Sequence, residues 1–162
     1  MSGGGDTAHG GVELVEVLLG DPRARMLEEA HIAEMNLRYG SGGPGRVAEE
    51  GFDPPVGCFL LAVVDGTPLG CGGFRPLDRR RAEIKRMYVD PSIRGRGVGR
   101  HLLHALEERT AAYGYHEVWL ETGTEQPEAI ALYVSSGYVA VPPYGEFKDD
   151  PRSRCFMRPL TA

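Results

Sequence analysis

Three glycines and two arginines stand close together at residues 94–99, which read Arg-Gly-Arg-Gly-Val-Gly. The stretch follows an apolar, strand-like run over residues 82–89 and precedes an amphipathic pattern typical of a helix. Glycines let a backbone approach a ligand without a Cβ clash, and the N–H groups at a helix start favour an anion. The spacing therefore predicts a phosphate-binding loop.

The common phosphate-binding motifs do not fit these residues. A P-loop requires Gly-Lys-Ser/Thr, but the only lysines, Lys85 and Lys148, follow Ile84 and Phe147. A dinucleotide fingerprint would require glycine where Arg100 stands. A glycine-rich turn between a strand and a helix, with a basic surface and no ligand, stays open as the alternative.

Composition excludes several classes of partner. The chain has 162 residues, is 41% hydrophobic and carries a formal net charge of −5, whereas proteins that bind nucleic acids or anionic membranes are usually basic. Its three cysteines form no C-x-x-C pair, which favours a reducing, cytoplasmic location over a disulfide framework. Residues 1–11 are glycine-rich without an apolar signal core, so we expect a disordered lead-in before one domain over residues 12–162.

Hydrophobic patterning predicts an α/β fold with a mixed sheet. We expect strands over residues 12–18, 58–64, 68–75, 82–89, 117–122, 138–141 and 154–159, and helices over residues 22–39, 97–113 and 127–136. The first helix should be capped by Asp21 and bury a stripe of Met26, Leu27, Ala30, Ala33 and Leu37. A hairpin at Asp65-Gly66 combined with helical crossovers implies a mixed sheet with helices on both faces.

Together these features resemble the GNAT superfamily of N-acetyltransferases, over nearly the whole chain from about Val12. The resemblance rests on Arg94-x-x-Gly97-x-Gly99 after the fourth strand, on the paired glycines Gly72 and Gly73, and on a helix that reads Ala129-x-x-x-Tyr133-x-x-x-Gly137-Tyr138. It implies a mostly antiparallel mixed sheet whose central strands splay apart. Agreement across several levels outweighs any one short motif.

The resemblance also implies an acetyl-CoA site and no metal. The pantetheine arm would lie between the splayed strands and the pyrophosphate on the glycine-rich loop. The residues implied are Met87, Tyr88, Val89, Arg94, Gly95, Arg96, Gly97, Val98 and Gly99. His101 and His104 share a helix face, but no third ligand stands near them in sequence, so a metal site is not expected.

Acetyl transfer to an amine requires proton transfers at both reacting groups, because an ammonium cannot attack and a thiolate leaves poorly. The resemblance makes Tyr133 the acid and Glu83 the base. A tyrosine that only packs on the sheet is the alternative for Tyr133. For Glu83 the alternatives are an ion pair with Arg75 or Arg86, or a water chain acting as the base, since a buried carboxylate requires a partner.

The acceptor pocket should be formed by the end of the first helix and by the loops at residues 40–57 and 144–147. Its candidate residues are Asn36, Tyr39, Phe52, Tyr144 and Glu146. Aromatic and acidic side chains favour a small primary amine with an apolar part. A protein lysine or N-terminal acetyltransferase and a non-catalytic acyl-CoA sensor are the alternatives, and a homodimer is left open.

Overall fold

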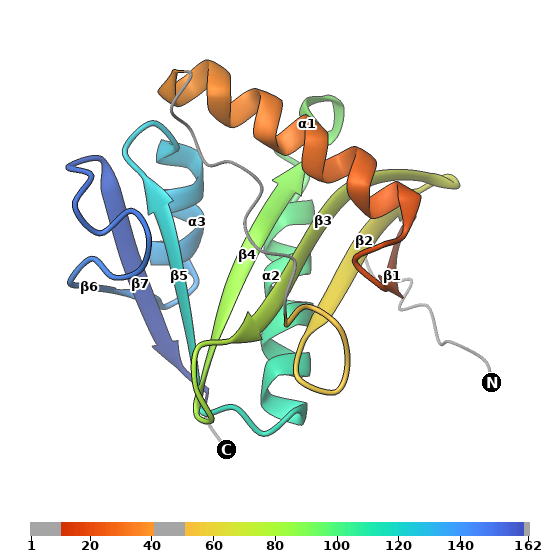
Figure 1. Cartoon of the computed structure of the whole chain (residues 1–162). Helices are drawn as coiled ribbons and strands as arrows, with labels where there is room; N and C mark the ends of the chain where they lie inside the picture. Colours follow the sequence, from red (N-terminus) through yellow and green to blue (C-terminus); the bar gives the residue numbers. More distant parts are fainter. Residues whose placement is uncertain (1–10, 41–50, 161–162) are drawn as a thin grey trace.

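A seven-stranded mixed sheet organises the chain, and the computed structural model describes residues 11–40 and 51–160. Its strands lie in the order β1-β2-β3-β4-β5-β7-β6 (Figure 1). They are β1 Val12–Val17, β2 Cys58–Val64, β3 Thr67–Pro76, β4 Arg81–Val89, β5 Glu117–Gly123, β6 Val139–Val141 and β7 Ser153–Pro159. The predicted strands are all present, and their ends differ from the prediction by at most one residue.

Strand directions confirm the expected fold class. Only β4 and β5 pair in parallel, and the other neighbouring strands pair antiparallel. The predicted lead-in lies outside the described residues except for Gly11, and so does most of the loop predicted over residues 40–57.

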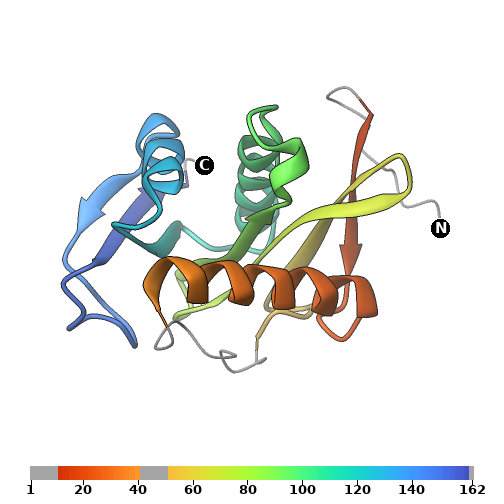
Figure 2. The ribbon, with the colours of Figure 1, turned by 90° about the horizontal axis from the view of Figure 1, so that it is seen from above.

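Helices cover both faces of this sheet. They are α1 Pro22–Tyr39, α2 Val98–Ala112 and α3 Pro127–Ser135, with a 3₁₀ turn η1 at Pro91–Ile93. Figure 2 shows α1 on one face and both α2 and α3 on the other. No helix within residues 11–40 and 51–160 is long and apolar enough to cross a membrane.

Two apolar clusters form the core, one on each face of the sheet. Strand β2 is buried along most of its length, so alternate residues enter different clusters. Leu60 packs with α2 residues such as Leu102, whereas Phe59 packs with Phe52 and with Leu27 of α1. Apolar packing on both faces of the sheet therefore holds the central strands in place, and with them the residues at the ends of these strands.

Of the predicted buried stripe of α1, only Leu27 is buried, and the other four residues are exposed. Met26 is 53% exposed and Leu37 is 88% exposed, while the buried residues are Ala24, Leu27, Glu28 and Met35. The helix turns a partly polar face to the sheet because Glu28 forms an ion pair with Arg86 of β4. The N-terminal cap was predicted correctly, since the Asp21 side chain accepts a hydrogen bond from the Arg23 N–H at 2.9 Å.

Candidate active site

Strands β4 and β5 pair over only part of their length and then separate. Residues Arg81–Ile84 pair with Glu117–Leu120, and no ladder continues beyond Ile84 and Leu120. The remaining half of β4 therefore has no strand partner among the described residues on the side of the gap. Such an edge accepts an extended ligand as an added strand.

A β-bulge in β4 accompanies this separation. Cys71 pairs with Tyr88 and Gly73 with Lys85, so Arg86 and Met87 together face the single residue Gly72. Arg86 has φ of 63°, in the left-handed region that non-glycine residues rarely adopt. A Cβ on Gly72 would lie 2.6 Å from the Met87 sulfur, so a larger residue at this position would displace the Met87 side chain.

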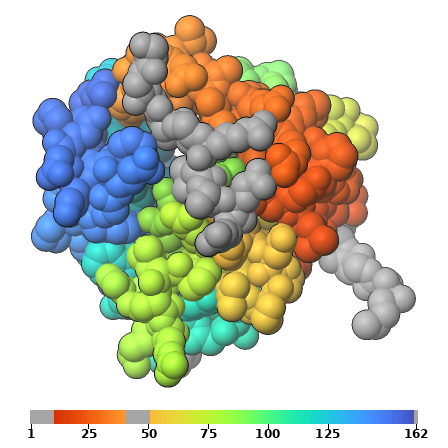
Figure 3. Space-filling model, in the orientation of Figure 1, coloured from red at the N-terminus to blue at the C-terminus, as the bar shows by residue number. Residues whose placement is uncertain are grey.

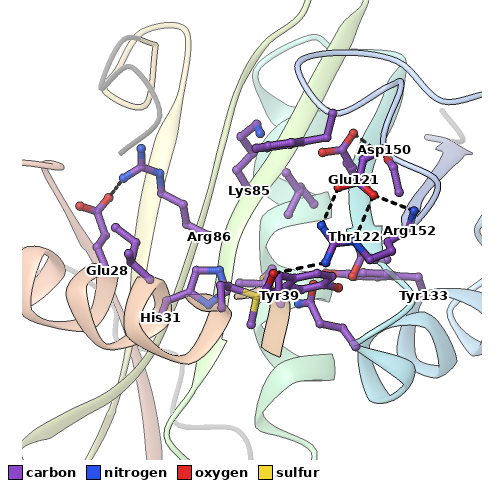
Figure 4. A pocket seen from close by; sticks show the side chains of 18 residues that line it. Glu28, His31, Tyr39, Lys85, Arg86, Glu121, Thr122, Tyr133, Asp150 and Arg152 are labelled. Atoms are coloured by element: carbon purple, nitrogen blue, oxygen red, sulfur yellow. Dashed lines mark hydrogen bonds and ion pairs between the residues drawn. The ribbon is translucent and has the colours of Figure 1, made fainter. Parts of the chain in front are cut away.

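A pocket occupies the region where the two strands diverge (Figure 4). Figure 3 shows α1 in orange and the C-terminal segment in blue bordering the same region of this face. The lining comes from α1, both strands, α3 and the loop before β7. The residues are Glu28, His31, Ile32, Met35, Tyr39, Ile84, Lys85, Arg86, Met87, Glu121, Thr122, Gly123, Gln126, Tyr133, Phe147, Asp150, Arg152 and Ser153.

The loop before α2 has the geometry expected of an anion site. Gly95 and Gly97 have φ of 80° and 79°, and Gly97 is the N-cap of α2 without a side-chain cap. A Cβ at either glycine would meet nothing within 4 Å, so their left-handed backbone, rather than close packing, requires glycine. Because the N-cap supplies no side-chain acceptor, the first-turn N–H groups of α2 are left for another acceptor, which fits a pyrophosphate.

Arg94, predicted to contact the pyrophosphate, is engaged elsewhere. Its Nη1 and Nη2 each lie 2.7 Å from a carboxylate oxygen of Glu34 in α1, and its Nε donates to the Val89 carbonyl at 2.7 Å. The guanidinium thus links α1, the end of β4 and the loop. Arg96 is exposed and takes part in no ion pair among the described residues, so it is the arginine available to a phosphate.

Tyr133, the predicted acid, is a buried residue of the pocket lining. It is 6% exposed and packs beside Tyr138 and Phe156, with ring centroids 5.8 and 6.4 Å away. Burial raises the pKa of Tyr133 to about 12. The phenol therefore keeps its proton at neutral pH, as a group that protonates a thiolate must.

Glu83, predicted to be the base, does not line the pocket. Its carboxylate is buried, and both oxygens have partners: Oε1 accepts from Arg75 Nε at 3.2 Å, and Oε2 accepts from the Tyr144 hydroxyl at 2.8 Å. Lys85 Nζ lies 3.8 Å from Oε1. These contacts match the ion-pair alternative, with Arg75 rather than Arg86 as the main partner.

Glu121, a carboxylate of β5 that was not among the predicted site residues, lines the pocket. It lies on the same face of β5 as Trp119, immediately after the pairing with β4 ends at Leu120. Ser153 Oγ and Cys155 Sγ lie 3.1 and 3.7 Å from its Oε2. A carboxylate on an interior strand was the signal that could have drawn attention to it.

Of the five predicted acceptor residues, only Tyr39 lines the pocket, and its hydroxyl donates to Gln126 Oε1 at 3.1 Å. Phe52 is fully buried in the core on the α1 face, so it cannot form a pocket wall. Tyr144 packs on Trp119 and bonds Glu83. Asn36 and Glu146 are exposed and lie outside the lining. Phe147 is the member of the 144–147 loop that reaches the pocket.

No cluster that could hold a metal ion is present among residues 11–40 and 51–160. Two elements that an acyl-CoA enzyme requires are both present. One is an extended edge beside a pocket, and the other is a glycine-rich helix start.

Comparison with known proteins agrees with this class. The model of the acetyltransferase (GNAT) family matches residues 24–138, and the chain belongs to this family of N-acetyltransferases. An IAA acetyltransferase from Azospirillum brasilense is 39% identical over 103 residues, covering 63% of this chain and 67% of that protein. An uncharacterized N-acetyltransferase of Bacillus subtilis is 35% identical, covering 52% of this chain and 57% of that protein.

Solved structures show the same architecture. A Klebsiella pneumoniae protein described as a proposed acyl-CoA N-acyltransferase has a TM-score of 0.78 and 28% identity, covering 93% of this chain and 98% of that one. A GNAT-family acetyltransferase from Elizabethkingia anophelis, solved with acetyl-CoA bound, has a TM-score of 0.70 and 18% identity, covering 93% and 99%. The second likeness concerns the fold alone.

Proposed function

We propose that the protein transfers the acetyl group of acetyl-CoA to a primary amine of a small molecule, by direct attack in a ternary complex. The observation that carries this proposal is the pocket at the divergence of β4 and β5, which contains Tyr133. Residues 12–162 would act as one catalytic domain. The alternative of a non-catalytic sensor would not require a buried phenol facing this pocket.

Acetyl-CoA would be held in two places. The edge of β4 near Met87 and Val89 would pair with the pantetheine amides, and the loop from Arg94 to Gly99 would bind the pyrophosphate through backbone N–H groups. Open space at Gly95 and Gly97 supports this placement, as does a bound acetyl-CoA in a relative of the same fold. Bound there, acetyl-CoA supplies a thioester carbon that an amine can attack.

Residues of this chain would supply the remaining chemistry. Tyr133 would act as the general acid and protonate the leaving sulfur. A general acid typically contributes on the order of 10²-fold or more to the rate. Glu83 would hold Lys85 and Tyr144 in place rather than meet the substrate, because each of its oxygens accepts a hydrogen bond from a residue outside the pocket lining, Arg75 or Tyr144.

The acceptor would be small because the loop before β7 reaches over the pocket. Phe147, Asp150 and Arg152 of this loop line the pocket. Tyr144 of the same loop donates a hydrogen bond to Glu83 of β4. A protein substrate requires an open groove for an extended segment, and this loop occupies part of that space. The similar IAA acetyltransferase does not identify the acceptor of this chain, because the match spans 63% of this chain.

A cytoplasmic location is part of the same proposal. Cys58, Cys71 and Cys155 are all unpaired thiols and all buried. Burial raises the pKa of Cys155, so this thiol stays protonated and does not serve as an acyl-accepting nucleophile.

A thiol-release assay tests the proposal. The purified chain would be incubated with acetyl-CoA and one acceptor at a time. The acceptors would be 2-phenylethylamine, tryptamine, spermidine, free amino acids and a lysine-containing peptide. We expect coenzyme A release with at least one free amine. Release with the peptide alone would favour the protein acetyltransferase, and binding of acetyl-CoA without release in any mixture would favour the sensor.

A further inference from the structure

One oxygen of Glu121 is free to accept a proton. Its two hydrogen-bond contacts, from Ser153 Oγ at 3.1 Å and Cys155 Sγ at 3.7 Å, both go to Oε2. Oε1 therefore has no hydrogen-bond partner among the described residues. The side chain is half-buried and lines the same pocket as Tyr133 (Figure 4).

Glu83 and Glu121 differ in this respect although they lie on adjacent strands. Glu83 has a partner on each oxygen and lies outside the pocket lining. Glu121 stands one residue beyond Leu120, where β5 leaves β4, so its carboxylate faces the space that a substrate would enter. Only one of the two carboxylates is therefore placed to meet an incoming amine.

The surroundings of Glu121 make it more basic than a surface carboxyl. Burial raises the pKa of Glu121, and the negative charge of Glu83 adds to this effect, while the Ser153 and Cys155 hydrogen bonds and the positive charge of Lys85 oppose it. A general base works best when its pKa approaches the working pH.

The other charged groups around the pocket are paired, so they compete little for the acceptor. On the α1 side, Glu28 and Arg86 form a buried ion pair. In the loop before β7, Arg152 Nη2 lies 3.0 Å from Asp150 Oδ2. Burial lowers the pKa of His31 to about 4, so this imidazole is neutral at pH 7.

We propose that Glu121 is the general base that removes a proton from the acceptor ammonium. This inference rests on the proposed acetyltransferase function. The ammonium donates one proton to Glu121 Oε1, and the neutral nitrogen attacks the thioester carbon. A C–N bond forms, the C–S bond breaks with its electron pair on sulfur, and Tyr133 protonates the sulfur. The nitrogen loses a second proton as the amide forms. Of the two protons that the nitrogen loses, one accounts for the proton that the sulfur gains, and the other passes to solvent.

Substitution of Glu121 tests this role. Glu121→Gln keeps the size and the oxygen that accepts from Ser153, but removes the basic site. With a free amine that is active in the thiol-release assay, we expect kcat/KM to fall on the order of 10²-fold and its acidic limb to disappear. Glu121→Asp should keep the acidic limb at a reduced rate. Glu117→Gln is the matched control, because Glu117 lies on the same face of β5 but outside the pocket lining. This variant should keep both the wild-type kcat/KM and its acidic limb.

A second readout does not depend on turnover. In ¹³C-carboxyl-labelled protein, the resonance lost in Glu121→Gln should titrate above the range of an ordinary glutamate, and 2-phenylethylamine should perturb it. Titration at or below the ordinary range would overturn the proposal, as would a Glu121→Gln enzyme within about twofold of wild type in kcat/KM. Absence of thiol release from wild type with every free amine would instead overturn the proposed function, and this role with it.

Discussion

The Tyr144 hydroxyl donates a hydrogen bond to Glu83 Oε2 at 2.8 Å, so the loop between β6 and β7 is fixed to the centre of the sheet. Both residues are buried or nearly so, and the Tyr144 ring also packs edge-on against Trp119 with centroids 5.4 Å apart. Glu83, predicted to be the base, and Tyr144, predicted to line the acceptor pocket, are thus hydrogen-bonded to one another. The contact explains why this loop can contribute Phe147 and Arg152 to the pocket lining.

Glu83→Gln should therefore lower stability more than it changes the pH dependence of catalysis. It removes the buried negative charge that the partly buried Arg75 and Lys85 face. We expect a loss of about 2 kcal/mol in the free energy of unfolding, measured by urea denaturation at pH 7. The kcat/KM profile should keep its acidic limb.

Tyr144→Phe is the matched control for that experiment, because it removes only the hydrogen bond on Oε2. A smaller stability loss than in Glu83→Gln is expected. A Glu83→Gln enzyme with wild-type stability and no acidic limb would return the role of base to Glu83.

Gly97→Glu should abolish acetyl-CoA binding. The substitution adds negative charge where the pyrophosphate would meet the α2 N-terminus, and it forces a non-glycine residue to adopt φ of 79°. Isothermal titration should show binding to wild type and none to the variant. Gly66→Glu is a suitable control, since Gly66 lies in the β2–β3 turn with φ of 80°, and a Cβ there would meet nothing within 4 Å. If both variants lost acetyl-CoA binding equally, backbone strain rather than the added charge at the loop would explain the loss.

Tyr133→Phe should reduce kcat by on the order of 10²-fold while leaving acetyl-CoA affinity nearly unchanged. The change keeps the ring that packs against Tyr138 and Phe156 and removes only the hydroxyl. Steady-state kinetics and calorimetry on the same preparation measure the two quantities. A kcat within about twofold of wild type would make Tyr133 a packing residue only.

The fold was accessible from sequence because its signals are local. Asp21-Pro22 starts a helix, Asp65-Gly66 closes a hairpin, and glycine at 97 marks a helix start, so each element could be placed within about a residue. The site was less accessible because its contacts are distant in sequence. Glu34 and Arg94 are 60 residues apart, yet their ion pair decides which arginine is available to a ligand.

Burial of particular side chains was equally hidden. Phe52 follows a glycine in an irregular stretch, and nothing local distinguishes a core aromatic residue from a pocket wall. The role of Glu121 depends on where β4 leaves β5, which requires the register of the sheet rather than the sequence of either strand. Motifs identified the type of site, but only the packed sheet distinguishes the paired carboxylate of Glu83 from the accessible one of Glu121.

His31 should make the protein less stable in mild acid. Desolvation lowers the pKa of His31 from 6.5 to about 4, and its Nδ1 is buried without a hydrogen-bond partner among the described residues. Between these two pH values the unfolded chain binds a proton that the folded chain does not, so stability rises with pH across this window and is lost as pH falls from about 6.5 towards about 4. One proton gives a slope of at most about 1.4 kcal/mol per pH unit.

The difference between wild type and His31→Gln isolates this contribution, because the carboxylates that also titrate below pH 6 are common to both proteins. Urea denaturation at pH 7, 6, 5 and 4.5 should show a steeper decline for wild type than for the variant. His104→Gln, which changes an exposed histidine of α2, should decline as steeply as wild type. Parallel curves for wild type and His31→Gln would contradict the prediction, because they would mean that this imidazole titrates alike in the folded and unfolded chains.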